Sequence, residues 1–239
     1  MDLRFEPMGD HGVIITCGDA LTDETFHKVV GLLQVLEQAH ESWIVECIPG
    51  YINVTVLYDP MKIFYIKMVE QDDRNVYTYV VDRLQQITNQ IEVFSETDGQ
   101  TIAVPVCYGG MYGPDLSYVA NYHGLTEQEV ISIHTSASYR VHMIGFAPGF
   151  PYLGGLSEQL ATPRKDVPRK QISAGSVGIA GNQTGVYPLA TPGGWQLLGR
   201  TPVALFDPAS DRPFLVQPGD SMQFYPITEL EYQCWEAEK

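Results

Sequence analysis

The segment between residues 140 and 200 constrains the fold most strongly, because glycine and proline are concentrated there. It holds 11 of the 22 glycines and 6 of the 16 prolines of a 239-residue chain. Beyond Arg140 helical periodicity is lost, and short apolar stretches are separated by Gly and Pro turns. These stretches are residues 139–146, 177–180, 195–198, 203–206 and 221–225. Many short strands separated by such turns are typical of a compact β-barrel or sandwich.

The first hundred residues follow a different pattern, in which short β-branched stretches alternate with amphipathic helices. Strands are predicted at residues 12–17, 43–48 and 52–58. A helix is predicted between the first two strands, with Thr22 as its N-cap and with Leu21 and Phe26 as a hydrophobic staple. Apolar residues at helical spacing from Tyr77 to Ile91 predict a second helix. This pattern suggests a split β-α-β layer with both helices on one face of a sheet.

A polar break near residue 98 separates the two regions. Beyond it, residues 101–108 are predicted as a strand, and Thr126 and Glu129 have the spacing of a capping box that opens a short helix. We therefore predict two domains. They are an α+β domain over residues 1–98 and a mainly β-barrel domain over residues 99–239, which carries the candidate site.

The charge of the chain is distributed unevenly. In total 14 Lys and Arg stand against 29 Asp and Glu, a net charge of −15. A partner that is nucleic acid or a membrane surface is excluded, because either would require a surplus of cations. Residues 1–99 hold 6 basic and 17 acidic side chains, whereas residues 140–200 hold 6 basic and 2 acidic ones. The glycine-rich segment is therefore expected to form an electropositive site for a small anion.

The cysteines and the apolar runs indicate in which cellular compartment the protein is expected. The four cysteines stand far apart with no Cys-x-x-Cys pair, so they predict neither a zinc site nor a disulfide scaffold. No apolar run approaches the roughly 20 residues that span a bilayer, and the N-terminus lacks a basic start followed by an apolar stretch. We expect a cytoplasmic protein with free thiols.

Common catalytic motifs do not occur in the chain. There is no Gly-Lys dipeptide for a P-loop, and no G-x-G-x-x-G that opens a helix. The sequence around Ser176, with Gly175 and Gly178, resembles a nucleophile elbow. That motif requires a helix after the turn, and the residues that follow cannot continue as a helix. We interpret these three residues as a turn whose backbone N–H groups are offered to an anion or oxyanion. The six histidines do not have metal-ligand spacing, so no metal site is expected.

Two Pro-Arg pairs are the strongest candidates for anion binding. Proline fixes φ before both Arg164 and Arg169, so the two guanidinium groups stand on a stiffened loop suited to carboxylate or phosphate. Arg200 either completes this cluster or pairs with Asp207. His142 is either a strand histidine or a site donor and general acid or base. Two aromatic residues, Tyr187 and Trp195, are either barrel core or a flat wall for a planar amide.

These motifs together resemble the family of the 5-oxoprolinase B subunit. The resemblance rests on residues 142–153, the pairs Pro163-Arg164 and Pro168-Arg169, residues 175–188, residues 191–195 and residues 199–202. The family includes the sporulation-kinase inhibitor KipI and the protein once called allophanate hydrolase subunit 1. It is related to the C and D subdomains of carboxyltransferase domains. One departure is Ser173, where the family has proline.

The resemblance implies a cyclophilin-like barrel after the α+β domain, and an enzyme that acts only with partners. The A, B and C subunits of 5-oxoprolinase would together hydrolyse the cyclic amide 5-oxoproline to glutamate at the expense of ATP. The complex would bind ATP, without a location assigned in this chain, and a biotin motif is absent. Arg164 and Arg169 would hold carboxylate or phosphate, assisted by Arg200 and His142. Gln183 would bond the amide edge.

Two other functions remain open. One is a regulatory protein that docks on a sensor histidine kinase and blocks its autophosphorylation. The other is urea or allophanate chemistry, which would require a partner that carries biotin or an amidase.

Overall fold

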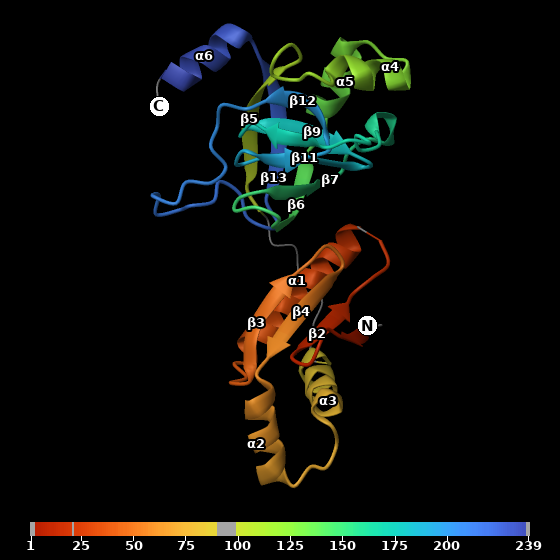
Figure 1. Ribbon diagram of the computed structural model, residues 1–239, viewed down its shortest axis with the longest axis vertical. Helices are drawn as coiled ribbons and strands as arrows, with labels where there is room; N and C mark the ends of the chain where they lie inside the picture. Colours follow the sequence, from red (N-terminus) through yellow and green to blue (C-terminus); the bar gives the residue numbers. More distant parts are fainter. Residues whose placement is uncertain (1–2, 21, 90–98, 238–239) are drawn as a thin grey trace. The chain divides into compact units, whose positions relative to one another are not determined.

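The computed structural model describes residues 3–20, 22–89 and 99–237, and the chain divides into two compact units, Met1–Thr97 and Asp98–Lys239 (Figure 1). The domain boundary predicted after residue 98 falls at the edge of a stretch outside the described residues. Leu21 of the predicted staple and Ile91 of the second predicted helix also lie outside them.

The first unit contains a four-stranded antiparallel sheet in the order β1-β2-β4-β3. Its strands are β1 (Arg4–Pro7), β2 (Gly12–Thr16), β3 (Ile44–Pro49) and β4 (Asn53–Tyr58). The helix α1 (Asp23–Gln38) connects β2 to β3, and β4 lies between these two strands. Because β2 and β3 are each antiparallel to β4, they run parallel to each other. This arrangement is the split β-α-β layer that the sequence pattern suggests.

One hydrophobic cluster holds this unit together. Alternate residues of β2 and β4, among them Ile15 and Val54, are fully buried against α1 and α3 (Val76–Thr88). The two helices also contact each other. The Thr22 hydroxyl accepts a hydrogen bond from the Thr25 N–H, so the predicted N-cap of α1 is confirmed.

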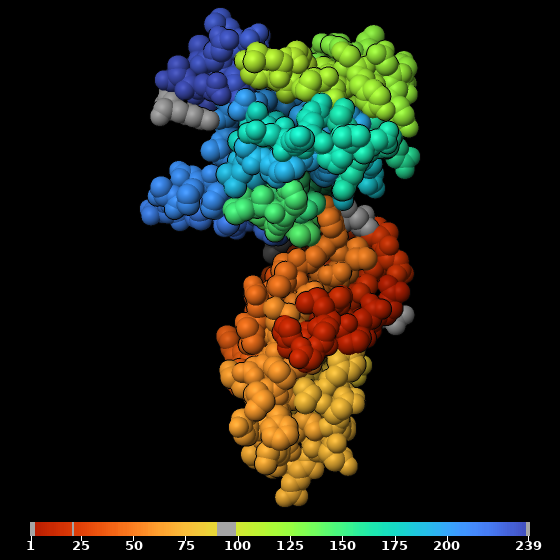
Figure 2. Space-filling view, viewed as in Figure 1, coloured from red at the N-terminus to blue at the C-terminus, as the bar shows by residue number. Residues whose placement is uncertain are grey.

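The helix α2 (Pro60–Glu70) was not expected from the sequence. Its N-terminus is stabilised, because Pro60 occupies the first turn and the Asp59 carboxylate accepts hydrogen bonds from two backbone N–H groups. Its apolar residues, however, mostly face outward, so helical periodicity gives no clear signal. The exposed ones are Met61, Phe64, Tyr65, Met68 and Val69. The first unit, which contains α2, is coloured from red to yellow in Figure 2.

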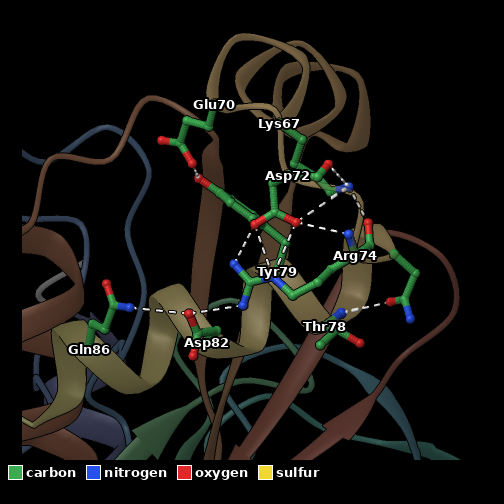
Figure 3. A network of polar contacts seen from close by, with 9 residues as sticks. Lys67, Glu70, Asp72, Arg74, Thr78, Tyr79, Asp82 and Gln86 are labelled. Atoms are coloured by element: carbon green, nitrogen blue, oxygen red, sulfur yellow. Dashed lines mark hydrogen bonds and ion pairs between the residues drawn. The ribbon is translucent and has the colours of Figure 1, made fainter.

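Polar contacts attach α2 to α3, since α2 buries only Ile63 and Lys67. The buried Lys67 ammonium donates to the backbone carbonyls of Asp72 and Arg74. The Arg74 guanidinium lies 2.5 Å from the Asp72 carboxylate and 3.1 Å from that of Asp82 on α3. Figure 3 shows this network at the connection between the two helices. The helical hairpin is therefore held by charged groups as well as by the burial of Ile63 and Tyr79 in the hydrophobic cluster.

The second unit is a closed barrel of seven strands in the order β10-β7-β6-β13-β5-β12-β9. Its strands are β5 (Thr101–Tyr108), β6 (Tyr139–Ile144), β7 (Pro151–Gly154), β9 (Ser176–Ala180), β10 (Gln183–Val186), β12 (Gln196–Arg200) and β13 (Ser221–Ile227). The first and last of them, β5 and β13, pair in parallel along their whole length. An α+β unit followed by a β-barrel confirms the predicted fold class.

Shorter elements surround the barrel. They are β8 (Arg169–Ile172), which pairs with β11 (Thr191–Gly193), the 3-10 turn Glu158–Leu160, and the helices α4 (Leu116–His123), α5 (Glu127–Ser136) and α6 (Glu229–Ala237). The capping box of Thr126 and Glu129 is present at α5 in both directions. None of the described helices is long and apolar enough to cross a membrane.

Two predictions for this region are wrong. Residues 203–206 do not form a strand and contribute only an isolated bridge from Phe206 to Phe214. The reason is the flanking Pro202 and Pro208, which lack the N–H that a ladder requires. Helical structure also returns after residue 140, because Thr228 and Glu231 form a second reciprocal cap at the start of α6.

A histidine lies inside the barrel core. His134 is fully buried and stacks on Phe224 at a ring separation of 4.9 Å. The Thr184 hydroxyl donates to the Gly178 carbonyl, so it accepts from Nε2–H of His134 at 3.0 Å. Nδ1 of His134 therefore accepts from the Tyr108 hydroxyl at 2.8 Å. Burial lowers the pKa of His134 to about 3, so the ring is neutral in the folded protein.

The stability of the barrel is expected to depend on this neutral ring. Because the folded pKa lies below the usual 6.5, the unfolded chain binds the proton first as the pH falls. The free energy of unfolding should therefore decrease below pH 6.5 by up to about 1.4 kcal/mol per pH unit. Urea denaturation between pH 4 and 8 measures this slope. The slope should weaken in His134→Gln and persist in a control at the exposed residue, His40→Gln; an unchanged slope in His134→Gln would contradict the assignment.

Candidate functional site

A cavity of about 300 Å³ in the second unit is lined mainly by aromatic side chains. The segments around it are the β6–β7 connection, the loop before β8, the end of β10 and the strand β11. The lining residues are Phe146, Phe150, Tyr152, Arg164, Pro168, Tyr187, Pro192, Gly193, Gly194 and Trp195. We refer to this cavity as the aromatic pocket. The glycine- and proline-rich segment of the sequence supplies every residue of it.

Three buried rings form the inner wall of the aromatic pocket. Phe150 meets Trp195 edge to face at 5.6 Å and meets Tyr187 in the same way at 5.4 Å. A Cβ atom at Gly185 would lie 3.1 Å from the Trp195 ring and 3.2 Å from that of Phe150, so the glycine makes room for this packing. Tyr187 and Trp195 are thus core residues that also face a cavity, and their role as a flat wall for a planar amide stays a prediction. They belong to a hydrophobic cluster and also line the cavity.

The tyrosines of the pocket are hydrogen-bonding groups and not bases. Burial raises the pKa of Tyr187 to about 12 and also raises the pKa of Tyr152. Both phenols are therefore protonated at neutral pH. No carboxylate, histidine, serine or cysteine is among the lining residues. The pocket offers apolar walls, phenol groups and one cation, so its own side chains suit recognition better than proton transfer.

That cation is Arg164. Its side chain is exposed and, among the described residues, makes no hydrogen bond or ion pair. Its positive charge favours the ionised forms of Tyr152 and Tyr187, so it lowers the pKa of both phenols against the larger effect of burial. The guanidinium group therefore lies close to the pocket phenols and is available to a ligand.

The backbone on both sides of Arg164 is fixed. The Pro163 carbonyl accepts a hydrogen bond of 3.0 Å from the side-chain amide of Gln196. The Lys165 N–H donates to the Gly194 carbonyl at 2.7 Å. Gln196 is buried on β12, and no sequence motif singles it out. These bonds hold the loop against the strand, so a ligand would meet an arginine whose backbone is already in place.

Asp115 organises the remaining cations of the loop. Its buried carboxylate accepts from Arg169 at 2.8 Å, from Lys165 at 3.1 Å and from the Leu197 N–H at 2.8 Å. Burial alone would raise the pKa of Asp115, but these bonds outweigh it and the pKa is lowered from its usual 3.8. The guanidinium of Arg169 is therefore already paired with a carboxylate of this chain, and its predicted role in holding a carboxylate or phosphate stays a prediction.

No local signal in the sequence identifies the role of Asp115. It precedes α4 at the N-cap position, where aspartate normally accepts a bond from the first turn of its own helix. Here it makes no side-chain capping bond, and its carboxylate reaches the loop between β7 and β8 and the strand β12 instead. Asp115 therefore connects the loop to the strand β12 instead of capping its own helix.

Arg200 belongs to a different part of the unit. Its Nε donates to the Ala174 carbonyl at 2.7 Å, so it neither completes the cation cluster nor bonds Asp207. Its charge acts on the phenol of Tyr232 in α6, where it favours the ionised form. Both alternatives for this residue are wrong, because the strand β12 directs its side chain to the turn before β9.

His142 and Gln183 are also outside the lining of the aromatic pocket. His142 is buried on β6, at the point where the register with β7 shifts. A Cβ atom at Gly154 would lie 2.2 Å from its Nε2, so its ring packs directly over that glycine. Gln183 opens β10 opposite Ala180. Neither residue therefore lines the aromatic pocket, and the roles predicted for them in the site stay predictions.

The predicted donor turn does not present free N–H groups. Gly175 has a φ of +80°, as a tight turn requires, but its N–H donates to the Tyr187 carbonyl. The N–H of Ser176 donates to the Ser173 carbonyl. Gly178 lies within β9, between β10 and β12. The interpretation of this turn as an oxyanion site is therefore wrong, because the barrel's own backbone uses these donors.

Known proteins are similar to this chain in sequence and in fold. Residues 3–216 match the family described as carboxyltransferase domain, subdomain C and D. The chain is 42% identical to the B subunit of 5-oxoprolinase from Bacillus subtilis, over 98% of its own length and 97% of that protein. It is 48% identical to the corresponding 5-oxoprolinase B subunit of Escherichia coli O157:H7, over 78% of this chain and 79% of that one.

Solved structures show the same architecture. The crystal structure of TTHA0988 superposes with a TM-score of 0.75 at 32% identity, over 90% of this chain and 40% of that longer chain. The urea carboxylase of Kluyveromyces lactis has the same fold, with a TM-score of 0.78 at 21% identity, over 97% of this chain and 22% of that one. The chain is thus a carboxyltransferase-type pair of subdomains. Within that class it belongs to the family of the 5-oxoprolinase B subunit.

Proposed function

We propose that this chain is the part of an ATP-dependent 5-oxoprolinase that binds 5-oxoproline in the aromatic pocket. The observation that carries the proposal is Arg164, a cation that pairs with no described residue and lines an otherwise aromatic cavity. 5-Oxoproline is a small planar lactam with one carboxylate. Its ring would pack on Trp195 and Tyr187, and its carboxylate would accept two parallel bonds from the guanidinium fork.

The composition of the pocket supports a role within a complex. Since its lining residues include no carboxylate, histidine, serine or cysteine, groups that activate the amide would come from other chains. The relatives are named as one subunit of an enzyme, which agrees with this division. The A and C subunits would therefore complete the enzyme. The complex would bind ATP. A cytoplasmic location remains part of this proposal.

Urea chemistry has some support as a second function. The urea amidolyase of Saccharomyces cerevisiae is 24% identical over 94% of this chain and 13% of that protein. Urea, however, has no negative charge, so it would leave Arg164 without a partner. The pocket therefore favours a carboxylated amide. The histidine-kinase hypothesis stays a prediction, because no described contact supports it.

Ligand binding to the full chain tests the proposal. Calorimetric titration should show binding of 5-oxoproline, binding at least tenfold weaker for 5-oxoprolinamide, which lacks the carboxylate charge, and none for urea. The Michaelis constants of the two cyclic amides should follow the same order when substrate-dependent ATP hydrolysis is measured with the A and C subunits added. Equal affinity for 5-oxoproline and its neutral amide would contradict the proposal, as would the absence of both binding and turnover.

A further inference from the structure

Phe146 lies at the aromatic pocket in a backbone conformation that residues other than glycine rarely adopt. Its φ is +67°. The Ala147 N–H donates to the Gly145 carbonyl at 2.8 Å, which closes a three-residue turn centred on Phe146. A γ-turn with positive φ at its central residue is rare and strained. Phe146 is also 65% exposed, so its burial contributes little to the stability of the protein without a ligand.

The rest of this connection is firmly held, so the turn does not relax. The Gly145 N–H donates to the Phe150 carbonyl, and the Phe150 N–H donates to the Ala147 carbonyl. Gly149 packs so tightly that a Cβ atom there would lie 2.7 Å from Cβ of Phe206. The surroundings therefore fix Phe146 in place. Strain that neighbouring contacts maintain in this way is common at ligand-binding sites.

A comparison within the chain shows that Phe146 is different from other residues of positive φ. The other non-glycine examples in the described ranges are His40 and Gln71. Gln71 is the C-cap of α2, and His40 directly follows the C-cap of α1. A left-handed residue is ordinary at a helix end, because it allows the last carbonyls to be bonded. Phe146 ends no helix, so its conformation lacks this structural reason.

We propose that Phe146 is a specificity-determining residue of the aromatic pocket. Its ring lines the cavity and meets Phe150 edge to face at 5.4 Å. A planar cyclic amide whose carboxylate is held by Arg164 would offer its flat face to this ring. Binding would then bury an aromatic surface that is exposed in the free protein, with a geometry fixed in advance. The inference rests on the proposed function. In addition to a carboxylate for Arg164, the ligand would need a flat face that packs on the Phe146 ring.

The test compares variants that keep or remove the ring. Asparagine tolerates the left-handed conformation, so Phe146→Asn should fold with an unchanged or higher unfolding midpoint. Its dissociation constant for 5-oxoproline should rise about five- to tenfold. In the enzyme reconstituted with the A and C subunits, KM should rise by the same factor while kcat stays within twofold. Phe146→Tyr keeps the ring and should bind within twofold of the wild type.

A matched control distinguishes the effect of losing the ring from the effect of relieving the backbone strain. Gln71→Gly relieves a positive φ outside the pocket and should leave 5-oxoproline binding unchanged. Wild-type affinity in Phe146→Asn would overturn the inference, and so would equal losses in Phe146→Asn and Phe146→Tyr. If Arg164→Gln weakens binding and Phe146→Asn does not, only this inference fails. If the wild type neither binds nor turns over 5-oxoproline, the proposed function fails and the inference fails with it.

Discussion

Replacement of Arg164 by glutamine is expected to weaken 5-oxoproline binding about a hundredfold and to leave the unfolding midpoint unchanged. A hydrogen bond to a charged group contributes about 1.5–3 kcal/mol, and 1.4 kcal/mol is a factor of ten in affinity. The bonds of the guanidinium would be made only with the ligand, because no described side chain pairs with it. Calorimetric titration and thermal unfolding of the same preparation measure the two effects.

Lys170 provides the matched control for this variant. It is exposed on β8, close to Arg164 in sequence, and does not line the pocket. Lys170→Gln removes the same charge and should change the affinity less than twofold. Arg164→Lys keeps the charge without the planar fork and should lie between the wild type and Arg164→Gln. Equal losses in Lys170→Gln and Arg164→Gln would attribute the effect to net charge and would contradict a direct contact.

Replacement of Asp115 by alanine should have the largest effect on stability. It would leave Arg169 and Lys165 without their carboxylate and would remove the acceptor of the buried Leu197 N–H. Removal of one partner of a buried ion pair costs about 3–5 kcal/mol. Since both cations are partly exposed, we expect a decrease of about 2–4 kcal/mol in the free energy of unfolding. Urea denaturation measures it.

The comparison with Asp166→Ala provides the control for Asp115. Asp166 is an exposed acid of the same loop, and its removal should change the free energy of unfolding by less than about 0.5 kcal/mol. Because the pKa of Asp115 in the folded chain lies below 3.8, its contribution is complete above about pH 4 and is lost as the pH falls further. The difference between wild type and Asp115→Ala should therefore shrink in acid. A difference that grows below pH 4 would contradict the ion-pair assignment.

Features with a local cause could be predicted from the sequence. The strand β5 occupies the residues predicted for it, because a β-branched run there is bounded by polar residues and by Gly109. The capping box at Thr126 and the N-cap at Thr22 form as expected, since a cap depends on three or four neighbouring residues. Tyr187, Trp195 and Arg164 meet at one cavity, and all three lie in the glycine-rich segment in which the site was expected.

Features with a distant cause could not be predicted in this way. Arg169 and Arg164 follow proline in the same manner, and only the position of Asp115, 54 residues earlier, separates a paired arginine from a free one. The N–H groups of the Gly175 turn are used by Tyr187 and Ser173 once the barrel forms. The helix α2 was missed for a different reason. Its apolar side chains face solvent, and the periodicity argument assumes that such residues face a core.

The parallel pairing of β5 with β13 has a consequence for how the chain acquires its structure. The Gln100 N–H bonds the Asp220 carboxylate across 120 positions of the chain, and the strand ladder continues from there to Ile227. Contacts of such high sequence separation form slowly, because a long loop must close before any of them is gained. During synthesis on the ribosome, therefore, the first unit can fold while the barrel strands are still being made, and the barrel can close only after residues 221–227 have emerged from the exit tunnel.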